Sequence, residues 1–238
     1  MNYVKKPIER ENILLPGGNK QSEHLLEKVL ITGENLIIIG SGCEGIANYF
    51  SEKFSSVDVI VNEYNSLLDY RQMLNKEANI KVKMMDFTRT DFQDKYFDLI
   101  YAQASISVAY RKDILKEIKR ILRNDGTMCM GEIVSLKGPV PAFVKDIWER
   151  SGLEPLPSSE IKKFYKDRGF SIIDEKNLSS TLKDFYQKLR TKISSVSKTE
   201  IESNKKLYSA IKHEADAYLK LGGDKFIGYK SLIMRKII

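Results

Sequence analysis

Residues 36–50 read LIIIGSGCEGIANYF, an apolar run that breaks into a glycine-rich loop and then resumes with a helical pattern. Glycines without side chains allow a tight turn and a close approach of the backbone to a ligand, and the helix that follows offers unpaired N–H groups. This order of strand, G-x-G-x-x-G loop and helix predicts a cofactor loop. The alternative is a turn whose glycines serve only the backbone. The residues expected to contact the cofactor here are Gly40, Ser41, Gly42 and Gly45.

Short apolar runs alternate with helical patterns from residue 35 to about residue 134. Runs that are apolar throughout are typical of parallel strands covered on both faces. The expected strands are Asn35–Ile39, Val57–Asn62, Ile80–Met85, Phe97–Ala102 and Thr127–Val134, and the expected helices are Glu44–Phe54, Ser66–Asn75 and Lys112–Leu122. Alternation of this kind predicts right-handed βαβ units and a doubly wound α/β sheet.

The segments on either side of this core are also patterned. Before it, a break at residues 16–18 is followed by a helix from about Ser22, which we expect to be the N-cap. After it, the expected elements are a helix through Trp148, helices over Ser158–Arg168 and Thr181–Leu221 (the latter as one or two helices), and strands over residues 169–177 and 226–238. No linker-like composition divides the chain, so one domain is expected over residues 1–238.

The composition argues against several classes of protein. Of the 238 residues, 42% are hydrophobic, and no apolar run approaches the length that crosses a bilayer. The two cysteines, Cys43 and Cys129, lack metal-binding spacing, so neither a disulfide framework nor a metal site is expected. The net charge is +7, but the lysines are spread along helical stretches, and a nucleic-acid partner is therefore not expected. The amino terminus lacks a signal or transit pattern, which favours a cytoplasmic protein.

Acidic side chains follow the second and third expected strands. Glu63 lies 18 residues beyond Gly45, where a carboxylate can accept hydrogen bonds from both hydroxyls of a ribose. Asp86 could accept from an adenine amine, and Phe87 could lie against the purine. The alternatives are an exposed strand-end acid, a capping aspartate and a core phenylalanine. Loop and acids together predict an adenosine-bearing cofactor, with Tyr64 also in its site, but they do not separate NAD from S-adenosylmethionine.

The stretch from residue 97 to residue 133 separates these cofactors. FDLIY at residues 97–101 and RILRNDG at residues 120–126, followed by a strand, resemble the class I S-adenosylmethionine-dependent methyltransferases, in the small-molecule branch with a C-terminal lid. The resemblance covers about residues 12–177 and the final strand. It implies S-adenosylmethionine as the cofactor and a Rossmann-like seven-stranded sheet whose last strand is antiparallel. A helical lid at residues 181–221 is expected before that strand.

The same resemblance extends to the amino terminus and has two departures. A PGG turn followed by a helix looks like a segment that folds over the bound cofactor, so residues 1–32 are expected to do this, with Gly17 and Gly18 in contact. Ile38 stands where the family usually has an acid, and Glu44 where it usually has a third glycine. One expected contact to the methionine end of the cofactor, or to the loop that positions it, is therefore in doubt.

Methyl transfer from a sulfonium is an in-line displacement that needs alignment and exclusion of water more than acid–base groups. Ala102 and Gln103, at the end of the fourth expected strand, should line the cleft where donor and acceptor meet, and Gln103 is expected to act on the reacting groups. If a general base assists, the candidates are Tyr110 and the two histidines, His24 and His213. Each histidine could equally be a surface or packing residue.

The class of acceptor follows by exclusion. The chain has no D/N-P-P-Y/F turn after the fourth expected strand, no cysteine there for attack on cytosine, and too few cysteines to hold arsenite. A small organic acceptor under the lid remains. Phe143, Trp148, Phe185 and Tyr186 could form its pocket, although aromatic residues at helical spacing are usually core.

Two rival functions stay open at this point. An NAD(P)-dependent oxidoreductase could use the same loop and Glu63, and would need a catalytic Tyr/Lys or His/Asp arrangement at the active face. A noncatalytic binding protein on the methyltransferase fold is the other rival, which the departure at Ile38 makes conceivable.

Overall fold

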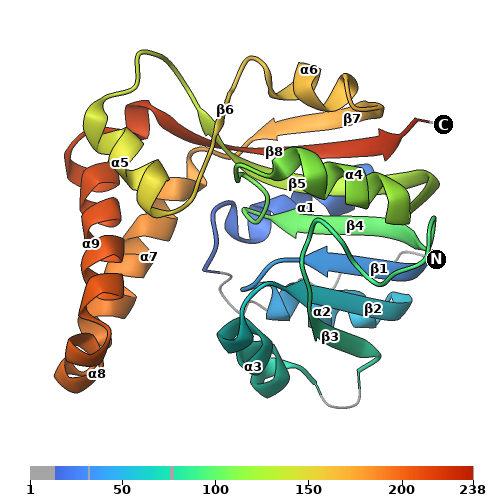
Figure 1. The fold of residues 1–238 in the computed structure, drawn as a ribbon, viewed down its shortest axis with the longest axis horizontal. Helices are drawn as coiled ribbons and strands as arrows, with labels where there is room; N and C mark the ends of the chain where they lie inside the picture. Colours follow the sequence, from blue (N-terminus) through green and yellow to red (C-terminus); the bar gives the residue numbers. More distant parts are fainter. Residues whose placement is uncertain (1–13, 32, 76–77, 238) are drawn as a thin grey trace.

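A mixed eight-stranded sheet forms the centre of the computed structural model, which describes residues 14–31, 33–75 and 78–237 (Figure 1). The strands are β1 (Gly33–Ile39), β2 (Phe54–Val61), β3 (Ile80–Met84), β4 (Phe97–Gln103), β5 (Leu122–Ser135), β6 (Leu156–Pro157), β7 (Phe170–Asn177) and β8 (Ile227–Lys236). Their order is β3-β2-β1-β4-β5-β8-β7, with β6 paired to the end of β5. The strands β1 to β5 pair in parallel, and β8 is antiparallel to β5 and β7. The Rossmann-like sheet with an antiparallel last strand is confirmed, and the two-residue β6 is an addition that the sequence did not predict.

Helices cover both faces of the sheet. They are α1 (Gly18–Lys28), α2 (Glu44–Ser51), α3 (Tyr64–Met73), α4 (Arg111–Ile121), α5 (Ala142–Arg150), α6 (Ile161–Lys166), α7 (Thr181–Ser195), α8 (Lys198–Ser203) and α9 (Lys205–Lys220). Side chains of α1, α2 and α3 pack on one face, and those of α4 and α6 on the other. In the described part of the chain, no helix is both long and apolar enough to cross a membrane.

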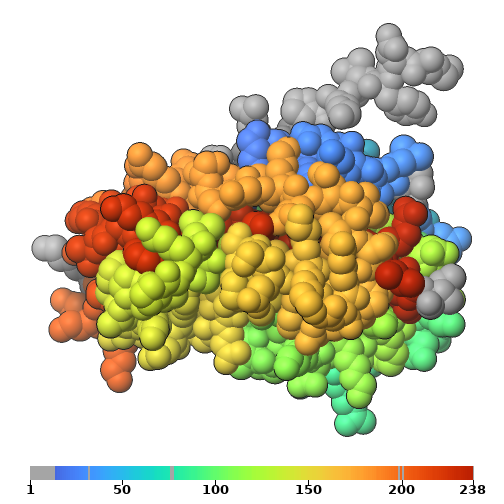
Figure 2. All heavy atoms as spheres, turned by 90° about the horizontal axis from the view of Figure 1, so that it is seen from above, coloured from blue at the N-terminus to red at the C-terminus, as the bar shows by residue number. Residues whose placement is uncertain are grey.

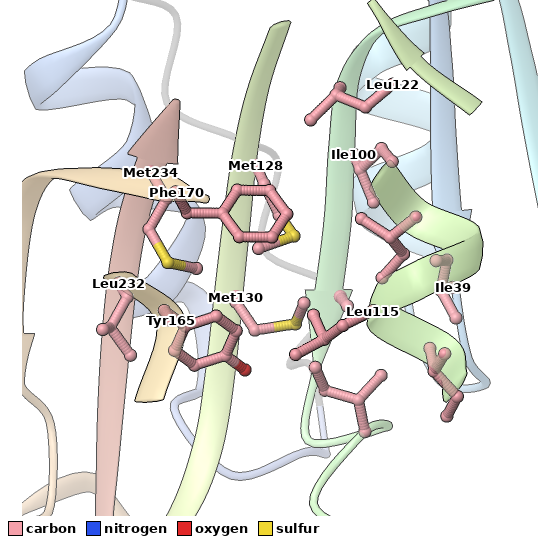
Figure 3. Packing of buried hydrophobic residues seen from close by; sticks show 14 of the residues in the cluster. Ile39, Ile100, Leu115, Leu122, Met128, Met130, Tyr165, Phe170, Leu232 and Met234 are labelled. Atoms are coloured by element: carbon pink, nitrogen blue, oxygen red, sulfur yellow. The ribbon is translucent and has the colours of Figure 1, made fainter. Parts of the chain in front are cut away.

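The alternating sides of the central strands build two core layers. In β1, Leu36 and Ile38 face the helices α1 to α3, while Ile37 and Ile39 face α4 and α6. Figure 3 shows the second layer, in which Met128 and Met130 of β5 pack among residues of α4, α6, β7 and β8. Burial on both faces explains why these strands read as continuous apolar runs.

A helical insertion separates β7 from β8. The segment predicted as one or two helices forms α7, α8 and α9, and α7 packs along α9. In Figure 1 these helices stand beyond the ends to which the β1 and β4 arrows point. Figure 2 shows the N-terminal helix (blue) lying against the later, orange part of the chain, which includes β7 and α7. The helices α1 and α7 therefore lie in contact, although they are far apart in the sequence.

The start of α1 corrects one expectation. The helix begins at Gly18 instead of near Ser22, because Gly17 at φ 86° turns the chain directly into it. Ser22 lies inside the helix, and its hydroxyl donates to the Asn19 carbonyl at 2.9 Å. The Ser22 N-cap prediction was wrong. Of the segment expected to cover the cofactor, residues 1–13 and 32 lie outside the described residues.

Candidate cofactor and methyl-transfer site

The carboxyl ends of β1, β2, β3 and β4 meet at one edge of the sheet, because all four strands are parallel neighbours. The glycine loop at residues 40–45 follows β1, Glu63 follows β2, Asp86 follows β3, and Gln103 ends β4. In open α/β sheets, ligands bind outside this edge. The fold thus brings the ends that carry the expected cofactor residues together.

The glycine loop has the backbone that its sequence requires. Gly40 and Gly42 have φ angles of 115° and 77°, and a Cβ at Gly40 would lie 2.6 Å from the Ser105 Cβ. The buried Tyr70 hydroxyl donates to the Gly40 carbonyl at 3.0 Å and accepts from the Cys43 N–H at 3.2 Å. This single hydroxyl therefore braces both ends of the turn.

The other two loop residues differ in exposure. Ser41 is exposed, and Gly45 is half-buried in the first turn of α2. Glu44 begins α2, where a carboxylate complements the partial positive charge of the helix N-terminus.

A groove of about 510 Å³ opens at the ends of β2 and β3, lined by Asn62, Met84, Met85, Asp86, Phe87, Thr88 and Tyr110. Three of these, Asp86, Phe87 and Tyr110, are among the expected site residues. Phe87 is 5% exposed and belongs to the core beneath, while Tyr110 is 46% exposed. The groove thus has an apolar base and one carboxylate.

Asp86 has a defined partner in its own turn. Its Oδ1 accepts from the Thr88 N–H and from the Thr88 hydroxyl, both at 2.8 Å. These two hydrogen bonds lower the pKa of the Asp86 carboxyl below its ordinary value. The side chain is therefore an ionised acceptor held at the border of the groove.

Glu63 and Tyr64 lie beside this groove at the start of α3. Glu63 is the exposed N-cap residue of α3, in an extended conformation, and Tyr64 is 60% exposed. Both side chains are accessible to a ligand at the tip of β2.

Gln103 is engaged by the protein itself. Its side chain is 2% exposed, its Oε1 accepts from the Tyr101 hydroxyl at 2.6 Å, and its Nε2 donates to the carbonyls of Pro16 and Gly18 at 2.9 and 3.0 Å. The preceding Ala102 is fully buried, and its carbonyl accepts from Gln21 Nε2 at 2.9 Å. These contacts favour a positioning role for Gln103 over the expected catalytic one.

Residues 15–18, here named the covering turn, lie over this edge. A Cβ at Gly42 would lie 3.2 Å from Leu15 side-chain atoms, and a Cβ at Gly17 would lie 2.5 Å from the Tyr229 ring. The Gly17 N–H donates to the Thr181 hydroxyl at 3.2 Å. The covering turn thus touches the glycine loop, β8 and the start of α7.

The candidate bases are placed differently from one another. His24 is fully buried in α1, with its Nδ1 2.9 Å from the Ser231 Oγ and its Nε2 2.8 Å from an Asp174 carboxylate oxygen. Occupation of both ring nitrogens favours a structural role over the expected catalytic one. His213 lies on α9, 3.3 Å from Asp146.

A buried ion pair supports the loop that joins β4 to α4. Glu132 of β5 is fully buried, lies 3.0 Å from Arg111 Nε, and accepts from the Ser107 hydroxyl at 3.1 Å and from the Tyr165 hydroxyl. Burial raises the pKa of the Glu132 carboxyl, against the opposing effect of Arg111. Sequence reasoning missed this network, because nothing local to Glu132 indicates that its partners come from other elements.

Both cysteines are buried. Burial raises the pKa of the Cys43 thiol far above its ordinary value and that of Cys129 to about 12, so both are thiols at neutral pH. Within the described ranges, no cluster of three or more His, Cys, Asp or Glu side chains could hold a metal ion.

The oxidoreductase rival would need a Tyr/Lys or a His/Asp arrangement at the active edge, and neither His24–Asp174 nor His213–Asp146 borders the groove. The sequence contains the Tyr-x-x-x-Lys spacing at Tyr49 to Lys53 and at Tyr208 to Lys212. The Lys53 ammonium lies over the Tyr49 ring at 5.0 Å, beyond the end of α2 remote from the glycine loop, and the second pair lies on α9. Neither pair borders the groove.

Comparison with solved structures identifies the fold. An enzyme from Haemonchus contortus, phosphoethanolamine N-methyltransferase 2, was solved with phosphomonomethylethanolamine and S-adenosylhomocysteine. It is 19% identical at a TM-score of 0.76, over 97% of this chain and 56% of that chain, so the present chain spans little more than half of that enzyme. A protein from Galdieria sulphuraria assigned as a sarcosine dimethylglycine methyltransferase is 19% identical, with a TM-score of 0.72. The match covers 92% of this chain and 84% of that protein. The [4+2]-cyclase SpnF is 17% identical, with a TM-score of 0.73. The match covers 92% of this chain and 81% of SpnF.

Comparison of the sequence with family models gives one match. A search of curated proteins finds no significant match. Residues 38–130, from the end of β1 into β5, match the family model described as a methyltransferase domain. This range holds the glycine loop, Glu63, the groove and the end of β4. By this match residues 38–130 are similar to methyltransferase domains, and the described chain shares its fold with the solved structures named above.

Proposed function

We propose that this protein transfers a methyl group from S-adenosylmethionine to a small organic acceptor by direct in-line displacement. The observation that carries the proposal is the open groove at the ends of β2 and β3, at the same edge of the sheet as the glycine loop and within the range that matches a methyltransferase domain. When bound, the cofactor supplies the electrophilic methyl group.

The adenosine half fits the residues that border the groove. Glu63 accepts from the ribose hydroxyls, and Asp86 accepts from the adenine amine. Phe87 forms an apolar floor, and the exposed rings of Tyr64 and Tyr110 cover the adenosine from the solvent side. Tyr110 therefore serves binding instead of the base chemistry first considered for it.

We propose that the methionine half binds between the glycine loop and the covering turn. The residues of this chain proposed to meet it are Gly17, Gly18, Gly40, Ser41, Gly42, Gly45 and the backbone at Ala102 and Gln103. Gly40 and Gly42 are also crowded by Ser105 and Leu15, so these two glycines serve the protein packing as well as the ligand.

The acceptor enters between the covering turn and the helical insertion, for which we propose the role of a lid over residues 181–221. The enzymes from Haemonchus contortus and Galdieria sulphuraria carry the names of small amine substrates. Since in-line transfer needs alignment and a dry site, no proton-transfer residue is assigned. The helices α5, α7 and α9 pack together through apolar side chains, which gives the lid an apolar core; among them are Phe143, Trp148, Phe185 and Tyr186.

We also propose a cytoplasmic location, which suits two buried free cysteines.

Calorimetric titration tests the cofactor. We expect S-adenosylhomocysteine and S-adenosylmethionine to bind one per chain and NAD not to bind. Binding of NAD in place of both would contradict methyl transfer. A screen of small amines, acids and alcohols with methyl-labelled S-adenosylmethionine then tests the reaction. Cofactor binding with no transfer to any small acceptor, but transfer to RNA or protein, would reject the acceptor class.

A further inference from the structure

The covering turn joins two parts of the molecule that are far apart in sequence. One end of it, at Leu15, lies against Gly42 of the glycine loop. Its other end, at Gly17, contacts Thr181, which is the first residue of α7 and of the helical insertion. A displacement of either neighbour therefore acts on the other through only four residues of the turn.

The turn is held too firmly from below to absorb such a displacement. Gln103 donates to the carbonyls on both sides of Gly17, at 2.9 and 3.0 Å, and is itself oriented by the Tyr101 hydroxyl. Bonds among buried polar groups of this kind are costly to break, because water cannot replace them.

The strand β8 supports the turn from the other side. The Tyr229 ring fills the position where a Cβ of Gly17 would lie, and the Tyr229 hydroxyl donates to Gln21 Oε1 at 2.6 Å. A Cβ at Gly131 would lie 1.9 Å from both of these oxygens, so that glycine makes room for the bond. Two glycines, at 17 and 131, are thus adapted to one set of contacts.

Thr181 connects this braced turn to the insertion. Its hydroxyl accepts from the Gly17 N–H at 3.2 Å and donates to the Leu178 carbonyl at 2.6 Å. The donor residue, Gly17, is the N-cap residue of α1 and has a left-handed conformation. The Thr181 methyl group cannot make this bond, which depends on the hydroxyl alone.

We propose that Thr181 is a positioning residue that couples the helical insertion to cofactor binding through the covering turn. The proposal rests on the proposed function, since it needs a cofactor between the glycine loop and the turn. A cofactor bound between residues 40–42 and the turn sets the position of this braced turn, and the Gly17 to Thr181 bond passes that position to the first turn of α7 on the acceptor side. The lid is ordered by the donor before the acceptor arrives.

The matched variants are Thr181→Val, which keeps the shape and removes the hydroxyl, and Thr181→Ser, which keeps the hydroxyl. The readouts are the dissociation constant of S-adenosylhomocysteine and hydrogen exchange of α7 amides with and without it. For the wild type and Thr181→Ser we expect the ligand to slow exchange in α7. For Thr181→Val we expect this slowing to be lost, and binding to weaken about three- to tenfold, the range for one neutral hydrogen bond.

The quantity compared is the ratio of α7 exchange rates without and with ligand. A helix that Thr181→Val merely loosens exchanges faster in both states and keeps the wild-type ratio, which would overturn the coupling. A wild-type ratio of one, despite binding, would also overturn it. Absence of S-adenosylhomocysteine binding by the wild type would reject the proposed function and the coupling with it, whereas binding with identical ratios in both variants would reject the coupling only.

Discussion

The glycine loop and the covering turn are two glycine-containing turns at one edge of the sheet, and they are built in opposite ways. The glycine loop at residues 40–45 is braced by Tyr70, 27 and 30 residues away along the chain, and by Ser105, whose hydroxyl bonds Ile39 at a separation of 66. The covering turn is held by partners 85, 87 and 164 residues away, and Gln21, just beyond it, by one 208 away. The partners that brace the glycine loop come from the part of the chain up to Ser105, just beyond β4, whereas the covering turn also contacts α7 and β8 near the end of the chain.

This difference separates two tasks. The glycine loop is braced by contacts within the part of the fold that carries the groove. The covering turn keeps its conformation only when α7 and β8 are packed against it. Changes at the covering turn should therefore cost global stability, whereas changes around the groove should cost ligand affinity.

The largest expected effect is at the covering turn. Gly17→Ala forces a side chain into a φ of 86° and toward Tyr229, so we expect the free energy of unfolding to fall by about 3 kcal/mol. Urea denaturation measures it. Gly152→Ala is the control, because Gly152 has a φ of 63° but no atom within 4 Å of an added Cβ, and only strain of about 1 kcal/mol applies. Equal losses in the two variants would show that the contact with Tyr229 contributes nothing.

The next effect concerns affinity at the groove. Glu63→Ala removes the proposed ribose acceptor, and S-adenosylhomocysteine binding should weaken by roughly 1 to 3 kcal/mol, measured by calorimetry. Stability should be nearly unchanged, because Glu63 is exposed. Glu52→Ala, an exposed acid at the other end of α2, should leave binding unaltered. A Glu63→Ala variant that binds as tightly as the wild type would remove the ribose contact from the account.

We expect the stability of the protein to depend on pH through Glu117 of α4, which accepts hydrogen bonds from Thr90 in the loop that carries Asp86. Burial opposes ionisation of Glu117, but hydrogen bonds from Arg120 and Thr90 outweigh it and lower the pKa of this carboxyl from 4.5 to about 2. Because the folded-state pKa is depressed, the stabilisation is complete above pH 4.5 and is lost as the pH falls toward 2.

Glu117→Gln tests this assignment. The variant should be less stable at pH 7 by about 2 kcal/mol, and the difference from the wild type should shrink between pH 4.5 and pH 2. Urea titrations across that range measure it, with the exposed Glu149→Gln as the control. A difference that stays constant with pH would mean that ionised Glu117 is not the cause.

The smallest expected effect is at the brace of the glycine loop. Tyr70→Phe removes one buried hydroxyl from the Gly40 carbonyl and the Cys43 N–H, and should lower stability by about 1 kcal/mol. Thermal unfolding compares it with Tyr49→Phe on α2, a half-buried ring. If Tyr70→Phe were as destabilising as Gly17→Ala, the contrast between the two turns would be lost.

The sequence predicts the glycine-loop side of the comparison well, for a physical reason. Continuous apolar runs and the loop glycines express local requirements of strand, turn and helix, and β1, β2 and β4 form within a few residues of the expected bounds. The helical insertion and the antiparallel last strand were also anticipated, the latter through the family resemblance.

The covering turn was much less predictable. Nothing near Gln103 indicates that its amide holds Pro16 and Gly18, nor near Thr181 that it accepts from Gly17. The two-residue β6 carries too little pattern to be seen, and Gly17 hid the true start of α1 because its left-handed conformation replaces a side-chain cap. Such contacts are decided by tertiary packing instead of local propensity.

A crystal structure of the protein with S-adenosylhomocysteine would show where the cofactor binds. We expect the ribose hydroxyls within hydrogen-bond distance of Glu63, the adenine in the groove between Phe87 and Tyr110, and the amino-acid end between the glycine loop and the covering turn. A ligand bound elsewhere, or a groove that stays empty in crystals soaked at saturating concentration, would contradict this expectation.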